Sequence, residues 1–172
     1  MLLDHKRLKW TLGDQVSGGS GPEPLNPRSL LSSYSPGSFA ATTFPAIDTW
    51  VQLRQGTAQL DAETSPEWTL EDANFGVYKF SGPGTFKGDF LFVTSSVGVD
   101  NKQFGYRLVK NGSEVLLGQT TVLIPGGLTA VPLLTQIVAV DGDTFRIEAQ
   151  NNSDATNLIS FYSNTGIQGW VF

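Results

Sequence analysis

The chain has 172 residues with 19 glycines, 9 prolines and only 16% charged residues, a composition typical of short strands joined by turns. Its formal net charge of -5 argues against a broad nucleic-acid surface, which needs clustered Lys and Arg. The chain has no cysteine, which excludes disulfides, thiolate nucleophiles and Cys-ligated metals, and its single histidine, His5, cannot supply a two-His metal site. No apolar run approaches the 18 residues of a membrane span.

Residues 1–45 are predicted to form an extended N-terminal arm. Residues 1–16 mix charged with apolar side chains, and they lack the apolar segment of a secretory signal peptide. Residues 17–45 are rich in Gly, Ser and Pro, so we expect no long ladder of strand hydrogen bonds there. A plain linker has few apolar residues, whereas an arm that lies on a partner needs them as anchors. The candidate docking residues are Leu8, Trp10, Leu12, Leu30, Leu31, Tyr34 and Phe39. A solvated terminus is the alternative for residues 1–16.

Residues 46–172 are predicted to form one all-β domain. Apolar and polar residues alternate at 47–53, and short apolar runs separated by turn residues follow to the end of the chain. Alternation within residues 85–99 places Phe86, Phe90 and Phe92 on one face, and Gly88 between them predicts a bend, a bulge or a close approach of another strand. No sustained 3.6-residue apolar period occurs after residue 45. The pattern therefore predicts about ten strands in a sandwich, roll or barrel.

Two turns stand out in the second half of the chain. Asn111-Gly112 lies between two apolar-rich runs, and this dipeptide supplies the positive φ angles of a type I′ hairpin turn. The apolar run over residues 133–140 ends at Asp141-Gly142-Asp143, and an alternating strand follows over residues 144–150. The terminal residues 166–172 are again apolar and glycine-rich.

The order of these motifs resembles the tumour-necrosis-factor/C1q-like (TNF/C1q-like) jelly roll over residues 75–172. The matching features are a glycine-and-aromatic strand at 84–92, a strand entering an Asn-Gly turn at 106–112, an apolar strand entering a Gly-Asp turn at 138–150, and a small-aromatic-apolar ending at 169–172. The resemblance implies a two-sheet, ten-stranded jelly roll that forms a tight homotrimer and acts by assembly or binding, not catalysis. By position, it implies that Phe90, Leu133 and Ile167 face the three-fold axis, with Phe172 near the base.

A trimeric jelly roll with an N-terminal arm and no cysteine also resembles virus and phage surface proteins, such as head decoration or cement proteins and fibre tips. This resemblance implies a non-enzymatic capsid decoration protein, made in the host cytoplasm and placed on the capsid exterior. Its arm would bind the major capsid protein or another virion component and reinforce the shell, without cofactor, nucleic acid or membrane. The alternatives are a receptor- or glycan-binding tip of a phage head or tail fibre, and a secreted TNF/C1q-like trimeric ligand.

No catalytic, cofactor or metal site is predicted. Asp141 and Asp143 are interpreted as turn residues, since the further oxygen ligands of a calcium site are not evident. Asn111-Gly112-Ser113 and Asn151-Asn152-Ser153 match the glycosylation pattern but lie in predicted turns, where Asn is favoured. Five aromatic residues are assigned to the core or an interface in preference to sugar stacking. They are Trp50, Trp68, Tyr78, Tyr162 and Trp170.

Overall fold

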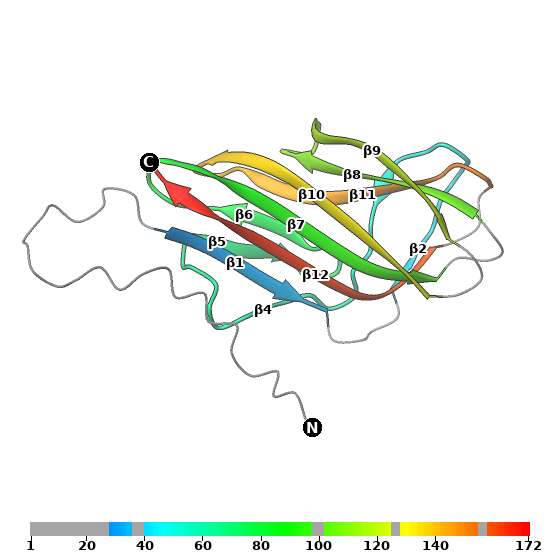
Figure 1. Cartoon of the computed structure of the whole chain (residues 1–172), viewed down its shortest axis with the longest axis horizontal. Helices are drawn as coiled ribbons and strands as arrows, with labels where there is room; N and C mark the ends of the chain where they lie inside the picture. The colour runs from blue at the N-terminus through cyan, green and yellow to red at the C-terminus, as the bar shows by residue number, and fades with distance from the viewer. Residues whose placement is uncertain (1–27, 36–39, 98–101, 125–127, 155–157) are drawn as a thin grey trace, which may run out of the picture.

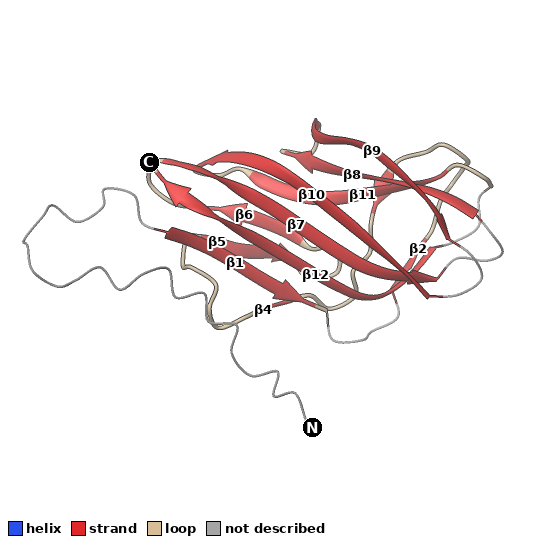
Figure 2. Ribbon diagram, in the orientation of Figure 1, coloured by secondary structure: helices blue, strands red, loops and turns tan. Residues whose placement is uncertain are grey.

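The structure, a computed structural model, describes residues 28–35, 40–97, 102–124, 128–154 and 158–172. These ranges contain strands and turns and no helix, as Figures 1 and 2 show, which confirms the all-β prediction. The strands are β1 (Arg28–Tyr34), β2 (Ala40–Thr42), β3 (Val51–Gln52), β4 (Gln59–Leu60), β5 (Trp68–Asp72), β6 (Val77–Phe80), β7 (Thr85–Val97), β8 (Lys102–Lys110), β9 (Glu114–Ile124), β10 (Leu128–Val140), β11 (Thr144–Asn151) and β12 (Leu158–Val171).

Two antiparallel sheets pack face to face as a sandwich. Sheet A has the order β10-β7-β12-β1-β4, with β2 also paired to β12. Sheet B has the order β5-β6-β11-β8-β9, with β3 also paired to β11. In Figure 1 the long strands of sheet A lie toward the viewer and sheet B lies behind them. The side chains between the two sheets form the core, so each sheet keeps one face turned outward.

Aromatic side chains fill much of the space between the sheets. Phe86, Phe90 and Phe92 on β7 are all at most 1% exposed, which confirms that they share an inward face. Trp68 of β5 packs across from sheet B, with its ring centre 5.2 Å from that of Phe86 in an edge-to-face arrangement and 5.1 Å from that of Phe80. Such contacts stabilise a core beyond the area that they bury.

Gly88 marks a close approach of two backbones in sheet A. It pairs directly with Gly169 of β12. A Cβ atom on Gly88 would lie 2.2 Å from the carbonyl oxygen of Gln168, and one on Gly169 would lie 2.2 Å from the carbonyl oxygen of Lys87. Of the three readings that the sequence left open for Gly88, the close approach is the one observed, and it requires glycine on both strands.

The predicted boundary at residue 45 is wrong. Residues 28–34 form β1, which pairs with β12 along its whole length and with β4 at its end. Residues 40–42 form β2, which also pairs with β12. The N-terminal part of the predicted arm is therefore limited to residues 1–27, which lie outside the described residues.

Two of the three inward positions of β1 are serines, so its residue pattern does not indicate a strand. Ser29 and Ser33 are buried on either side of Leu31. The Ser29 hydroxyl accepts a hydrogen bond from Trp68 Nε1 at 2.9 Å, and the Ser33 hydroxyl accepts one from the Tyr78 hydroxyl at 3.1 Å. The serines thus satisfy the polar atoms of two core aromatics, a role that an alternation of apolar residues would not reveal.

The predicted turns are largely confirmed, but one predicted strand is shorter than expected. Asn111 and Gly112 have φ of 50° and 75°, as a type I′ turn requires, and Gly142 has φ of 89°. The alternating segment at 47–53 forms only the two-residue strand β3. Asp48, with φ of 56°, interrupts an extended backbone before it, and Ile47 is 48% exposed.

Candidate functional site: the outer face of sheet A

The outward side chains of sheet A form an ordered grid, which we call the outer A face. Strand alternation places every second residue of β10, β7, β12 and β1 on it, and the register aligns them in rows across the sheet. One row is Gln136, Asp89, Gln168 and Leu30, and the next is Leu134, Leu91, Gly166 and Ser32. These rows bring together residues more than 100 positions apart in the chain.

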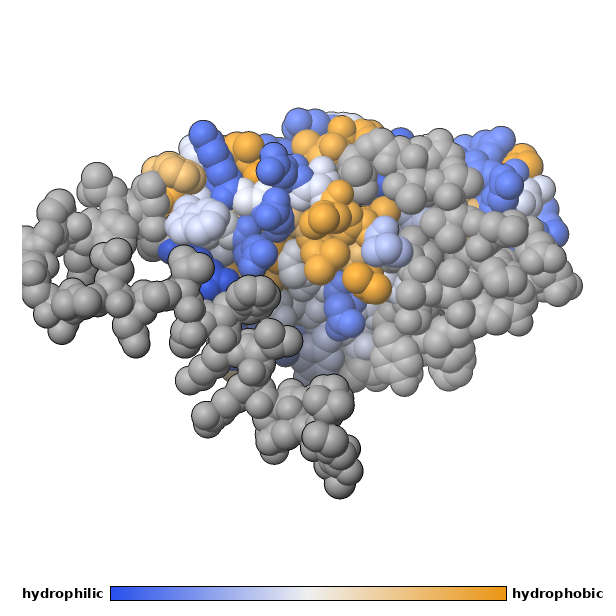
Figure 3. All heavy atoms as spheres, viewed as in Figure 1, coloured by the Kyte–Doolittle hydropathy of each residue, from blue (hydrophilic) through white to orange (hydrophobic). Residues whose placement is uncertain are grey.

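Exposed apolar side chains are concentrated on this face. Among the residues whose burial the structure describes, nine large hydrophobic residues are exposed, and seven of them belong to β1, β7, β10, β12 or the residue after β12. These seven are Tyr34, Leu91, Leu134, Val138, Val140, Trp170 and Phe172. Figure 3 shows orange surface gathered over the middle of this sheet beside a blue, hydrophilic band. Exposed apolar side chains gathered on one face, with polar residues among them, are typical of a protein interface.

A shallow hollow of about 370 Å³ lies at the centre of the face. Gly166 forms its floor, and Leu30, Leu91 and Leu134 stand around it. A Cβ atom on Gly166 would have no neighbour within 4 Å. Gly166 therefore differs from Gly169, three residues later on the same strand, because nothing within this one chain requires glycine at position 166.

Polar groups flank the hollow on the side of the C-terminus. Asp89, Gln136 and Gln168 are exposed and adjacent in register. Beyond them the Lys87 ammonium lies 5.4 Å from the centre of the Phe172 ring, within the range of a cation–π contact. The face can thus offer apolar contact at its centre and hydrogen bonds at one side. It presents no group with an obvious catalytic role.

The structure corrects three of the four predicted axis-facing residues. Phe90, Leu133 and Ile167 are at most 2% exposed in the single chain, because they point into the core between the sheets. A side chain without exposed surface cannot contribute contact area to another subunit. A shift by one residue along a strand moves a side chain to the opposite face, so the predicted residues lie on the inward face of their strands. The residues beside them, Leu91 and Leu134 among them, point outward.

Phe172 and the described docking candidates have different positions. Phe172 is 57% exposed and its place near the base of a trimer stays a prediction. Leu31 is fully buried in the core, so its assignment to docking is wrong. Leu30 is half-buried at the central hollow, and Tyr34 is 39% exposed with its hydroxyl donating to Gln59 Oε1. Four further docking candidates lie outside the described residues: Leu8, Trp10, Leu12 and Phe39.

The Asp141–Asp143 turn is structural, as the sequence indicated. The Asp143 carboxylate accepts hydrogen bonds from Asn111 Nδ2 and the Val140 backbone N–H, and it forms a 2.7 Å ion pair with Lys110. Burial alone would raise the pKa of Asp143, but the bonds from Lys110, Asn111 and Val140 outweigh burial and hold that pKa below its usual value. Within the described ranges, no group of three or more His, Asp or Glu side chains is placed to hold a metal ion.

The two possible glycosylation sites also serve turns. Asn111 bonds through its side chain to Asp143 and to the Thr144 backbone N–H. Asn151 is buried, and its side-chain oxygen accepts the backbone N–H groups of Ser153 and Asp154. Both asparagines are therefore engaged in the fold.

The described residues contain no helix that is long and apolar enough to cross a membrane.

Four of the five selected aromatic residues have described side chains. Trp68 and Tyr78 belong to the core, and Trp170 is 54% exposed on the outer A face. Trp50 is half-buried beside sheet B, and the Arg107 guanidinium covers it with its Cζ 4.3 Å from the ring centre. One face of the Trp50 ring is therefore covered by Arg107. The side chain of Tyr162 lies outside the described part.

Comparison with known proteins identifies the fold. No family model matches the sequence, and no curated protein matches it. Among solved structures, murine APRIL aligns with a TM-score of 0.54 at 11% identity, over 83% of this chain and 99% of that one. The PRD1 vertex protein aligns with a TM-score of 0.50 at 10% identity, over 84% and 97%. The globular domain of zebrafish complement 1qA aligns at 14% identity with a TM-score of 0.48, over 80% and 94%. The chain thus has the fold of a TNF-like jelly roll, which the order of its motifs predicted.

Proposed function

We propose that the chain forms a homotrimer through the outer A face. The observation that carries this proposal is Gly166, a glycine in the interior of a long strand with free space above it. Glycine in a strand interior costs about 0.5–1 kcal/mol relative to alanine, and no contact within the chain offsets that cost. Glycine at position 166 is explained if a neighbouring subunit approaches the hollow closely.

The distribution of apolar surface supports the same face. Leu91 and Leu134, 44% and 65% exposed, flank the hollow, and their burial against another copy removes apolar area from water. The adjacent row of Asp89, Gln136 and Gln168 supplies hydrogen-bonding groups that fix the orientation of a partner. The three-fold arrangement itself rests on the resemblance to TNF/C1q-like proteins.

The experiment is a pair of arginine substitutions measured by size-exclusion chromatography with light scattering. Gly166→Arg places a long charged side chain in the hollow, where its Cβ meets no obstacle in the chain, so we expect a folded monomer. Val115→Arg changes a residue that is 46% exposed on sheet B, and it should remain a trimer. Leu134→Glu is the second interface variant should Gly166→Arg fold poorly. A wild-type protein that is monomeric at tens of micromolar, or a trimeric Gly166→Arg, would refute the proposal.

The proposed role of the trimer is that of a non-enzymatic virion structural protein, a capsid decoration or cement protein. The likeness in fold to the PRD1 vertex protein supports a place on a virion. The predicted docking residues Leu8, Trp10 and Leu12 lie before β1, so residues 1–27 would bind the capsid protein or another virion component. Three such segments on one trimer raise their effective concentration at the capsid, so that individually weak contacts hold together.

Truncation tests this role. Removal of residues 1–45 is unsuitable, because it deletes β1 and β2. Removal of residues 1–21 leaves every described strand intact, and we expect a trimer that no longer co-sediments with purified particles of the virus that encodes it. Equal sedimentation of the truncated and complete proteins contradicts docking by this segment. Binding of the complete protein to host cells and not to particles favours the alternative of a fibre tip.

A further inference from the structure

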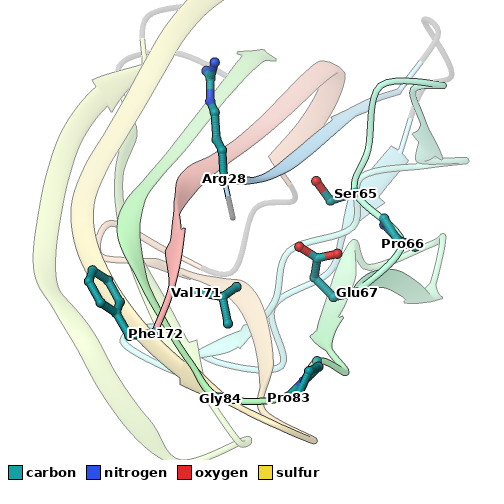
Figure 4. Close-up of a pocket in the computed structure, with 9 residues that line it drawn as sticks. Arg28, Ser65, Pro66, Glu67, Pro83, Gly84, Val171 and Phe172 are labelled. Carbon is teal, nitrogen blue, oxygen red and sulfur yellow. The ribbon is translucent and has the colours of Figure 1, made fainter. Parts of the chain in front are cut away.

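One end of the sandwich carries a second pocket, which shares no lining residue with the central hollow of the outer A face. Its volume is about 510 Å³, and it lies where β1 begins and β12 ends. The turns at residues 65–67 and 82–84 complete its walls. Figure 4 shows the pocket, with Val171 and the Glu67 carboxylate pointing toward one another across the opening and Pro83 below them.

The backbone holds the walls of this end pocket in place. Phe172 and Thr85 exchange backbone hydrogen bonds of 2.9 and 3.0 Å, and the Ser81 N–H donates to the Glu67 carbonyl at 2.7 Å. Gly84 has φ of 88°, and a Cβ there would lie 2.4 Å from the Phe172 carbonyl oxygen. The backbone of the pocket walls is therefore fixed by the fold.

The lining selects an apolar occupant. Pro66, Pro83 and Val171 contribute apolar surface, and apolar atoms make up most of the wall. Two charged residues also line the pocket, Glu67 with its carboxylate and Arg28 with its guanidinium. An apolar pocket with charged groups at its rim suits a hydrophobic side chain whose flanking backbone remains near water.

We propose that Leu25 of the same chain fills the end pocket, with Pro24 and Pro27 against its rim. Arg28, the first described residue, lines the pocket, so Leu25 is tethered three residues away. Three residues span at most about 10 Å, which keeps Leu25 close to the opening. Proline at positions 24 and 27 narrows the backbone choices of the residues before them to extended conformations.

No other large apolar side chain competes from nearby in the sequence. Residues 17–24 before Leu25 read SGGSGPEP, and the preceding large apolar residue is Val16, twelve positions before Arg28. A plug at Leu25 would fix the direction in which residues 1–21 leave the body. The proposed contact of Leu25 with the end pocket goes beyond the proposed function, because the contact forms within one chain and does not require a trimer.

Engineered cysteines test the plug directly, because the chain contains no natural cysteine. A disulfide forms only when the two Cα atoms come within about 7 Å. We expect Leu25→Cys with Pro83→Cys to oxidise within one chain, giving a cross-linked monomer on a non-reducing gel. The matched control is Leu25→Cys with Ser81→Cys, which has the same tether and an exposed cysteine two residues from Pro83 that does not line the pocket. Cross-linking no faster than in the control, or cross-linking mainly between chains, overturns the proposal.

A stability measurement provides the second, independent readout. Leu25→Ser removes apolar surface from the pocket and should raise the unfolding equilibrium constant about 10-fold, since burial of a leucine contributes more than 1 kcal/mol. Leu12→Ser removes the same side chain thirteen residues earlier, where no short tether holds it beside the pocket, and should leave the unfolding constant unchanged. Equal behaviour of the two serine variants contradicts the plug. Both tests leave the outer A face untouched, so failure of the plug is distinguishable from failure of the trimer.

Discussion

The substitution Asp143→Asn tests whether the network behind the Asn111-Gly112 hairpin stabilises the fold. The Oδ1 atom of Asp143 accepts from Asn111 Nδ2 at 2.7 Å, and Oδ2 accepts from Lys110 Nζ at 2.7 Å and from the Val140 N–H at 2.8 Å. Every partner is a donor. An asparagine at this position offers one acceptor and one NH₂ group, so either orientation of its amide turns a donor toward another donor.

The expected cost is about 2 kcal/mol, roughly a 30-fold increase in the unfolding constant. Asp143 is 6% exposed, so water cannot replace the lost partners freely. Lys110 Nζ also donates to the Val138 carbonyl at 3.0 Å, which keeps the cost below the ~3–5 kcal/mol of a fully buried broken ion pair. Asp141→Asn, at an exposed position in the same turn, is the control and should change stability by less than about 0.5 kcal/mol.

The pH dependence gives the sharper outcome. Because the folded protein lowers the pKa of Asp143, its contribution is complete at neutral pH and is lost as the pH falls below about 4, through the folded-state pKa. Urea denaturation at fixed protein concentration should therefore show a difference between wild type and Asp143→Asn at pH 7 that shrinks at pH 3. A difference that is equal at both pH values, or absent at pH 7, would refute this account of the network.

Two further predictions concern sheet A. Gly88→Ala should destabilise the fold by about 3 kcal/mol or more, because its Cβ would collide with the Gln168 carbonyl oxygen. Gly166→Ala should instead stabilise the single chain by about 0.5–1 kcal/mol, because its Cβ meets no atom of the chain and the conformational cost of glycine is removed. Chemical denaturation of both variants checks this contrast. Ser29→Ala should cost about 1–3 kcal/mol, because the buried Trp68 N–H loses its acceptor, and a loss below 0.5 kcal/mol would show that this bond is dispensable.

The general architecture was predictable because its signals are local. The Asn-Gly turn, the Phe-rich alternation on β7 and the Asp-Gly turn each depend on the conformational preferences of a few adjacent residues, and the structure contains all three. The close approach at Gly88 was among the expected readings for the same reason. These features predict an all-β sandwich, roll or barrel, and their order along the chain carries the resemblance to a TNF/C1q-like jelly roll.

The inward and outward positions of β7 and β10 were not predictable in the same way. On β7, Phe90 and Leu91 are both apolar, and on β10, Leu133 and Leu134 are both apolar, so alternation alone leaves the inward member of each pair undetermined. The choice depends on which residues lie across the core, a long-range property. Phe86 and Phe92 on β7 offered the available clue, because residues an even number apart share a face and Phe90 belongs to their set.

The N-terminal boundary failed for a different physical reason. A strand whose inner positions are serines is stable only when specific donors or acceptors face them, and here Trp68 and Tyr78 provide them from the opposite sheet. Those aromatics lie 39 and 45 residues further along the chain. The richness of residues 17–45 in Ser, Gly and Pro therefore indicates no long strand, although β1 and β2 lie within that segment.

The two glycines of β12 separate what the fold requires from what an assembly requires. At Gly169 a side chain would collide with the neighbouring backbone, so the single chain explains the residue completely. At Gly166 a side chain would meet nothing, although this position lies at the centre of the most apolar outward surface described. A monomer does not need this glycine, and it leaves the leucines around the glycine in water. Both observations are accounted for if a second copy occupies the space above Gly166. The inward position of Phe90, Leu133 and Ile167 strengthens this argument, because it removes them from the interface and leaves the contact to side chains that one chain cannot bury.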